Sequence, residues 1–250
     1  IGKATLTGTV ALKDMNGKFL SVTSTNGLTF DKTFVEENAI FEASSSGSKY
    51  ALVGSNGKYV NMYYVHDVKC EGPGGGIGSG KTYFLSNLPG HESYHGSLAV
   101  AKTESEHCRF QIEQITKINV TGVITLRNQE GCYVKVTESG GLTCTSSVAD
   151  DNAKFTVKHD GSKLALIGNN GKYVNMYYVD DVKCEGPGGG LALGVGYNGD
   201  GTVLLTISGY QGQDGATYFL SSEPGNASYN GSLAVKRSAV DTCRFSIDSV

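Results

Sequence analysis

The chain repeats one stretch almost unchanged: residues 56–76 read NGKYVNMYYVHDVKCEGPGGG, and residues 170–190 read NGKYVNMYYVDDVKCEGPGGG. The two copies differ only where Asp180 replaces His66. An internal repeat of this kind indicates a duplicated structural unit. The repeat is therefore the starting point for predicting the fold.

Each copy is surrounded by short hydrophobic runs separated by turn residues. In the first half these runs fall at 10–12, 19–22, 28–30 and 40–42, with Asn-Gly pairs between them. Asn-Gly is preferred in tight hairpins because both central residues take positive φ. A strand start of the pattern G-[KC]-[FY]-[LV] recurs 40 residues apart within each half, at Gly17, Gly57, Gly131 and Gly171.

The spacing of the repeat predicts the fold class. The offset between the halves is 114 residues, which divides into three units of about 38. Three four-stranded units make a β-trefoil. We therefore predict an all-β fold, with two tandem β-trefoil domains related by an internal duplication.

The two predicted domains are unequal. After residue 76 the offset rises from 114 to 135, so the second half carries 21 additional residues. They include predicted strands at 191–197 and 202–208. Either the first trefoil has lost two strands, or its sequence omits a stretch near Gly76, which the exposed edges of an open trefoil favour. The expected domains are 1–117, about two strands short, and 118–250, complete.

Composition limits the partners. The net charge of −3 includes no block of basic residues that could neutralise a phosphate backbone, so we expect no nucleic acid. No apolar run approaches the roughly 18 residues needed to cross a bilayer, so we expect no membrane partner. The chain begins with Ile1, not Met, which implies a processed precursor or a fragment and slightly favours the extracellular matrix.

The closing motifs carry a family resemblance. Cys108-Arg109-Phe110-Gln111-Ile112 and Cys243-Arg244-Phe245-Ser246-Ile247, with the strand starts above, resemble the fascin-like, actin-crosslinking trefoils over nearly the whole chain. The resemblance implies a structural protein with a protein partner, and a cytoskeletal location. Fascins have four trefoils, so their filament surface cannot be transferred residue by residue. A weaker likeness to the two-trefoil plant agglutinins implies a glycan partner as the alternative.

One motif imitates a nucleotide site. Residues 75–82 satisfy G-x4-G-K-[ST] literally. That loop holds phosphate when it leads from a strand into a helix, whereas 83–86 here reads as a strand. The matching place in the second half, 214–217, lacks the Lys. We expect no nucleotide and no other cofactor.

Other reactive side chains are better explained as surface or core residues than as parts of a metal or catalytic site. His66, Asp67 and Cys70 could ligate zinc, but the second copy replaces His66, so we expect no metal. The pairs Glu36-Glu37 and Asp150-Asp151 read as surface charge because neighbours on a turn point apart. We therefore expect no enzyme.

The six cysteines leave their pairing open. Cys132 and Cys144 are the two without a repeat-related partner, and they flank a turn slightly out of register. A local disulfide and buried free thiols are both compatible with this spacing.

The repeated strand offers the best candidate binding surface, because it ends in tyrosines beside a charged turn. Tyrosine supplies a large rigid contact area with a polar tip. Strict alternation would place Tyr64 on the face of Val60 and Met62 and turn one of the two faces to the core. The candidate residues are Asn61, Tyr63, Tyr64, Asp67, Lys69, Asn175, Tyr177, Tyr178, Asp181 and Lys183.

Two similar faces at a limited separation suit a bivalent protein. We predict a structural protein that bridges filament subunits or organises a matrix, with sugar binding as the alternative.

Overall fold

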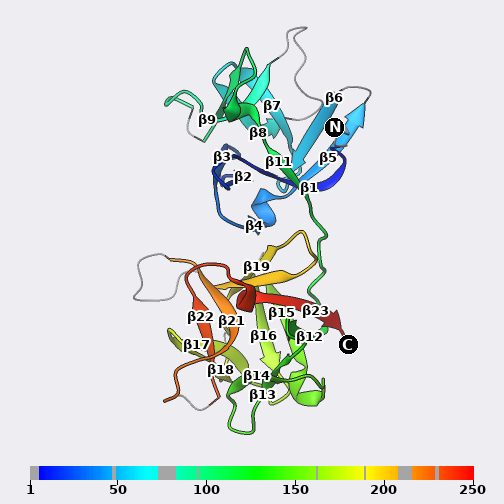
Figure 1. Ribbon diagram of the computed structural model, residues 1–250, viewed down its shortest axis with the longest axis vertical. Coiled ribbons are helices and arrows are strands. Elements are labelled where there is room, and N and C mark those ends of the chain that lie inside the picture. The colour runs from blue at the N-terminus through cyan, green and yellow to red at the C-terminus, as the bar shows by residue number, and fades with distance from the viewer. Residues whose placement is uncertain are drawn as a thin grey trace. The chain divides into compact units, whose positions relative to one another are not determined.

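The computed structural model describes residues 6–46, 49–72, 83–94, 96–161, 163–188, 190–207, 216–228 and 231–250. The chain forms two compact units, Ile1–Thr116 and Lys117–Val250 (Figure 1). Among the described residues the helices are single 3-10 turns, and the rest of the regular structure is antiparallel strand. The predicted all-β fold of duplicated trefoils is confirmed.

Unit 2 shows the trefoil in full. Its strands are β12 (Val123–Asn128), β13 (Tyr133–Val136), β14 (Leu142–Ser146), β15 (Phe155–Asp160), β16 (Lys163–Gly168), β17 (Tyr173–Tyr178), β18 (Asp181–Gly186), β19 (Leu193–Tyr197), β20 (Val203–Ile207), β21 (Tyr218–Pro224), β22 (Leu233–Lys236) and β23 (Arg244–Ser249). The 3-10 turns are η3 (Asp151–Ala153) and η4 (Asp241–Cys243).

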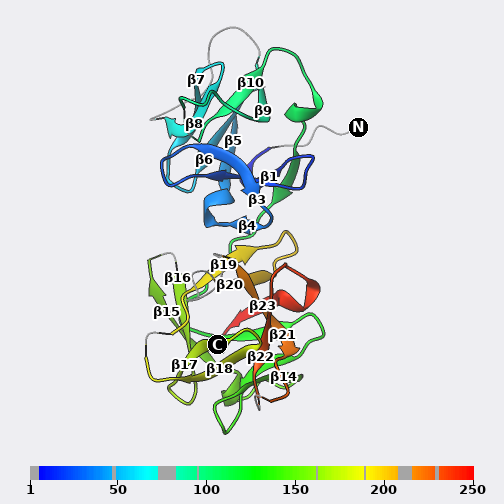
Figure 2. The ribbon, with the colours of Figure 1, turned by 90° about the vertical axis from the view of Figure 1, so that its left-hand side faces the viewer.

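Six strands of unit 2 close a barrel. Following the pairings, β12 joins β15, then β16, β19, β20 and β23, and β23 returns to β12. The remaining strands form three hairpins, β13–β14, β17–β18 and β21–β22, and each hairpin pairs with a barrel strand. Strands β14, β18 and β22 contact one another, so the hairpins gather at one end of the barrel (Figure 2).

Unit 1 repeats this plan in part. Its strands are β1 (Gly8–Lys13), β2 (Phe19–Val22), β3 (Leu28–Lys32), β4 (Val35–Glu36), β5 (Phe41–Ser46), β6 (Lys49–Gly54), β7 (Tyr59–Tyr64), β8 (Asp67–Gly72), β9 (Phe84–Pro89), β10 (Leu98–Ala101) and β11 (Gln111–Gln114). Its 3-10 turns are η1 (Glu37–Ala39) and η2 (Glu106–Cys108).

Four strands of unit 1 match barrel strands of unit 2: β11, β1, β5 and β6 pair in that order. The hairpins β2–β3, β7–β8 and β9–β10 match those of unit 2. In the described part of unit 1 no strand corresponds to β19 or β20, whose place would lie between β8 and β9. The G-x4-G-K-[ST] motif at 75–82 falls there, outside the described residues.

Each unit has its own hydrophobic core. In unit 2, alternate residues of the barrel strands point inward, and Phe155 and Phe245 are fully buried. In unit 1, Phe41 takes the place of Phe155 and is fully buried, and Leu20 of β2 is buried in the same core. A fully buried side chain of this size contributes about 1.5–3 kcal/mol, so the core residues dominate the stability of both units.

Hydrogen bonds of a buried cysteine hold part of each repeated stretch in place. The buried Cys70 Sγ donates to the carbonyl of Lys58 at 3.1 Å, and Asn56 Nδ2 donates to the carbonyl of Cys70 at 2.7 Å. Cys184 makes the matching bond to Lys172 O at 3.0 Å. Burial raises the pKa of both thiols, which favours their neutral form in the core.

A buried carboxylate in unit 1 predicts a pH effect. Asp14 accepts hydrogen bonds from Lys18 N at 2.8 Å and Asn87 Nδ2 at 2.8 Å. Burial by itself would raise the pKa of Asp14, but the hydrogen bonds lower it below its usual value. The stability that Asp14 contributes is thus complete above about pH 4, the unfolded value, and is lost as pH falls through the lower folded pKa.

We therefore expect Asp14→Asn to reduce the loss of stability between pH 7 and pH 3, measured by urea unfolding. Unit 2 supplies the reciprocal test, because Asn128 occupies the matching position and accepts from Cys132 N at 2.8 Å. Asn128→Asp should steepen the pH dependence. Identical pH profiles for wild type and Asp14→Asn would contradict this assignment.

Candidate binding surface

The repeated hairpin exposes two tyrosine rings at its tip. In unit 1, Met62 pairs with Val68 while Tyr64 pairs with Asp67, so the register shifts at Tyr63. Such a β-bulge breaks the alternation of side chains. Tyr63 is 44% exposed and Tyr64 66% exposed as a result.

The second copy has the same bulge and corrects the expectation of strict alternation. The register of β17 shifts between Met176 and Tyr178. Val174 and Met176 are buried, yet Tyr178, which alternation would place on their face, is 62% exposed and Tyr177 38% exposed. The bulge therefore turns both tyrosines of each hairpin to solvent. We call Tyr63 with Tyr64, and Tyr177 with Tyr178, the tyrosine surface of each unit.

A neighbouring loop extends the tyrosine surface of unit 1. The rings of Tyr64 and Tyr94 stack with centroids 6.1 Å apart and planes 13° apart. Lys69 Nζ lies 5.7 Å from the centroid of Tyr94. Sequence reasoning missed Tyr94, although SYHGSLAV at 93–100 matches SYNGSLAV at 228–235. Its counterpart, Tyr229, lies outside the described residues.

The charged candidates lie beneath this surface. Asp67 and Lys69 form an ion pair at 3.3 Å, with side chains 7% and 20% exposed. Asp181 and Lys183 form the same pair at 3.3 Å. Within the described part of the chain, Oδ1 of each aspartate accepts no hydrogen bond. The lysine of each pair therefore contributes its charge but no hydrogen bond to this oxygen. These carboxylates support the hairpin and are too buried to meet a large partner.

The two candidate amides also face inward. A Cβ added at Gly72 would lie 1.7 Å from Asn61 Nδ2, and one added at Gly186 would lie 2.0 Å from Asn175 Nδ2. Each amide thus packs directly over a glycine of the partner strand, and both asparagines are half-buried. Of the ten candidates, the four tyrosines are the exposed ones.

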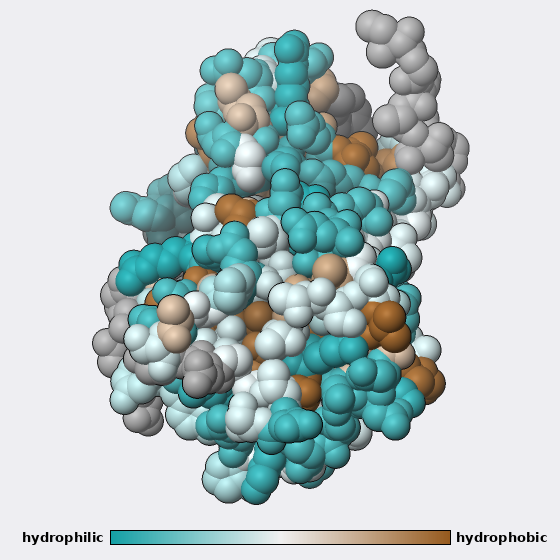
Figure 3. Space-filling model, turned by 60° about the horizontal axis from the view of Figure 1, so that its bottom comes forward, coloured by the Kyte–Doolittle hydropathy of each residue, from teal (hydrophilic) through white to brown (hydrophobic). Residues whose placement is uncertain are grey.

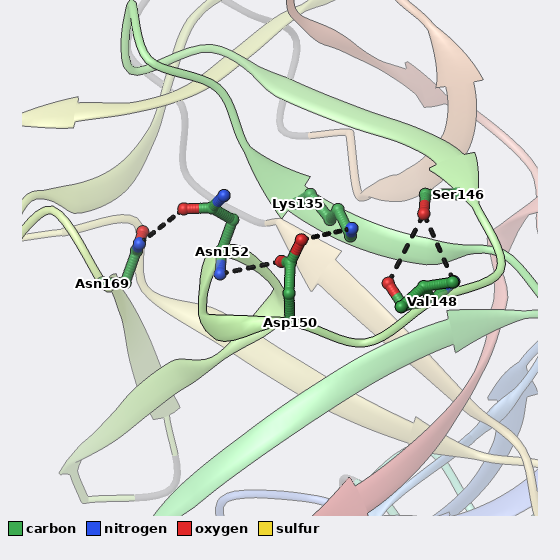
Figure 4. A network of polar contacts seen from close by, with 6 residues as sticks. All are labelled: Lys135, Ser146, Val148, Asp150, Asn152 and Asn169. Carbon is green, nitrogen blue, oxygen red and sulfur yellow. Dashed lines mark hydrogen bonds and ion pairs between the residues drawn. The ribbon is translucent and has the colours of Figure 1, made fainter.

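Asp150 serves as a helix cap. It accepts from Asn152 N at 3.0 Å at the start of η3 and from Lys135 Nζ at 2.8 Å (Figure 4). The hydrogen bond from Lys135 lowers the pKa of Asp150. A carboxylate held ionised in this way is a poor general acid, and its contacts are those of a local structural network.

Other candidate chemistry is limited. All six cysteines lie in the described residues and are free; Cys144 Sγ donates to the carbonyl of Cys132 at 3.3 Å. No group of three or more His, Cys, Asp or Glu placed to hold a metal occurs in the described ranges. Nor does any helix there have the length and apolar character required to span a membrane.

This chain matches a known domain family. The sequence model of the Fascin domain matches residues 4–75 and 90–190, which is more than half of the chain. The chain therefore belongs to the Fascin domain family. Membership supports a structural or binding role and does not point to catalysis. A search of curated proteins finds no match to this chain.

Solved structures add a comparison of folds. A mosquitocidal holotoxin matches 96% of this chain with a TM-score of 0.56 and 11% identity, a likeness of fold alone. This chain spans only 33% of the holotoxin.

Two further structures are less similar. A ricin B-like lectin from Macrolepiota procera, solved with lactose, matches 53% of this chain and 99% of its own, with a TM-score of 0.39 and 11% identity. A GlcNAcα1-4Gal-releasing endo-β-galactosidase from Clostridium perfringens matches 97% and 68%, with a TM-score of 0.33 and 12% identity. With TM-scores this low, neither bears on the function of this chain.

Proposed function

We propose that this chain is a non-enzymatic protein that bridges protein filaments or matrix components through its two tyrosine surfaces. The observation that carries the proposal is the β-bulge, which exposes the same pair of tyrosines in both units. Membership of the Fascin domain family supports a binding role of this kind.

The tyrosine surface has the properties of a protein contact. Tyrosine is enriched among residues that dominate binding energy, because its ring buries a large area with few rotatable bonds. The ion pair of Asp67 and Lys69 and the stack of Tyr64 on Tyr94 restrain the tip of the hairpin in unit 1. Two such surfaces on one chain convert weak single contacts into bridging by raising the effective concentration.

Co-sedimentation with actin filaments at low salt tests this function. High-speed pelleting measures binding, and low-speed pelleting measures crosslinked bundles. Changing Tyr63 and Tyr64 to Ala should abolish bundling while leaving unit 2 able to bind. Changing Tyr177 and Tyr178 as well should reduce binding at least tenfold, roughly 1.4 kcal/mol, a modest demand for hot-spot residues.

Tyr50→Ala is the matched control, because Tyr50 is 49% exposed but lies on β6, outside the tyrosine surface. It should bind and bundle as the wild type does. Bundling that survives loss of all four tyrosines would reject the proposed surface. Absence of the wild type from the pellet would reject actin as the filament.

Glycan binding is the second candidate function, favoured by the stacked and exposed ring of Tyr64. An aromatic face can pack against the apolar face of a sugar ring as it does against other apolar groups. A glycan screen that detects binding lost in Tyr64→Ala would favour this function. A screen without hits would remove it.

A further inference from the structure

Unit 2 contains a pocket of about 240 Å³ outside its tyrosine surface. One wall is β14, and the other is formed by Ser222 and residues 224–227 and 231–233, at the end of β21 and the start of β22. Figure 3 brings forward the end of unit 2 at which β13 and β14 lie, where apolar and weakly polar surface gathers between hydrophilic margins. The apolar lining comes from Leu142, Cys144, Pro224, Ala227 and Leu233.

The lining favours an uncharged ligand with few polar groups. None of the described lining residues is charged. Two polar groups of the lining already have hydrogen-bond partners within the protein. Ser232 Oγ donates to Asp180 O at 3.2 Å, and Asn226 Oδ1 accepts from Ser228 N at 2.9 Å. Thr143, Thr145, Ser222, Gly225 and Gly231 complete the lining.

The cysteine in the pocket is a neutral group. Cys144 Sγ donates to Cys132 O at 3.3 Å, and burial raises the pKa of the thiol to about 11. A thiol of this kind is a weak nucleophile at neutral pH and packs as a small apolar side chain. Cys144 therefore lines the pocket as a packing group.

The size of the pocket selects one ring. An apolar cavity of about 150 Å³ holds a benzene molecule, so the larger pocket here can hold an aromatic ring with one or two substituents. A hexose would bury several hydroxyl groups, and each would need a partner or cost free energy. An aromatic ring with a single hydroxyl group matches the balance of this lining better.

The duplication sets a small side chain in unit 2 against a large one in unit 1 at this wall of the pocket. The residue that matches Cys144 in unit 1 is Phe30, by the offset of 114. The Phe30 ring packs against the core of unit 1 and stacks on Phe110, with centroids 5.2 Å apart and planes 6° apart. Cys144 puts a much smaller side chain at this position, and its Sγ donates to Cys132 O.

We propose that the pocket beside Cys144 binds a small uncharged phenol, with the ring against Leu142 and Leu233 and the hydroxyl group toward the serine and threonine hydroxyls. The proposal goes beyond the bridging function, because it uses none of the four tyrosines. It is also specific to unit 2.

Titration of the full chain with p-cresol, followed by amide NMR shifts, tests the proposal. We expect shifts confined to β14 and the β21–β22 turn, with a Kd on the order of 1 mM for so small a ligand. Benzoate, which is charged, and galactose, which carries several hydroxyls, should each bind at least tenfold more weakly. Tighter binding of galactose, or no shifts with p-cresol, would overturn the proposal.

Comparison with unit 1 also suggests a variant that tests the pocket. Cys144→Phe restores the residue of unit 1 and should weaken p-cresol binding at least tenfold, whereas Cys144→Ala should retain it. Unchanged binding in Cys144→Phe would exclude this pocket. Ala227→Leu narrows the opposite wall and provides a second test if Cys144→Phe does not fold. A variant without the four surface tyrosines should bind p-cresol normally, which separates this site from the bridging function.

Discussion

Gly141→Ala is expected to destabilise unit 2 by about 3 kcal/mol or more, the upper range for overpacking a rigid site. A Cβ at Gly141 would lie 2.1 Å from the carbonyl oxygen of Gly231 and 2.8 Å from its carbonyl carbon and Cα. All three are backbone atoms, so no side chain can rotate away. The amide of Leu142 also donates to that carbonyl, and separating the two segments would break this bond.

Gly188→Ala is the matched control in the same unit. Gly188 is exposed, and a Cβ there would meet no atom within 4 Å. We expect its free energy of unfolding to stay within about 0.5 kcal/mol of the wild type. Urea unfolding followed by near-ultraviolet circular dichroism of the tyrosines measures both variants. Equal stability of the two variants would show that the segments separate easily.

Unit 1 contains the same approach and permits a replicate. A Cβ at Gly27 would lie 1.9 Å from the carbonyl oxygen of Gly96, and Leu28 N donates to that oxygen at 2.5 Å. Gly27→Ala should therefore destabilise unit 1 as Gly141→Ala destabilises unit 2. A large effect in one unit alone would indicate that the two copies differ in rigidity.

The fold could be predicted from the sequence because the turns and strand starts recur at the spacing of trefoil units. Asn-Gly turns and the strand starts 40 residues apart mark the hairpins. The extra residues of the second half contain β19 and β20, which complete the six-stranded barrel of unit 2. Close approaches such as Gly141 to Gly231 join segments far apart in sequence, so no local pattern reveals them.

The site was only partly predictable, because a β-bulge is not visible as a pattern. Strict alternation would place the Tyr178 side chain on the same buried face as Val174 and Met176. The register shift turns it to solvent instead. The same hairpin buries Asp181, which sequence reasoning placed on the binding surface as a charged turn residue. Burial of a charge depends on the surrounding strands, and these are set by the whole trefoil.

Lys183→Met is expected to cost unit 2 about 3 kcal/mol, because it leaves the Asp181 carboxylate buried without its cation. The two side chains are 17% and 5% exposed, and the atoms lie 3.3 Å apart. Lys154→Met is the surface control, since Lys154 and its partner Asp151 are 41% and 86% exposed. Such an exposed pair is worth about 0–1 kcal/mol. Equal costs for the two variants would show that Asp181 does not depend on its lysine.

The double variant Asp181→Asn with Lys183→Met distinguishes a role of Lys183 in the stability of unit 2 from a role in filament binding. Removing both charges removes the unpaired carboxylate, so most of the lost stability should return, as it does when buried ion pairs are replaced together. If the tyrosine surface is the contact, the double variant should also bind filaments as the wild type does. Restored stability with binding still lost would make Lys183 a contact residue. This comparison is needed because Lys183→Met alone would weaken binding in either case, by loosening the hairpin that holds Tyr177 and Tyr178.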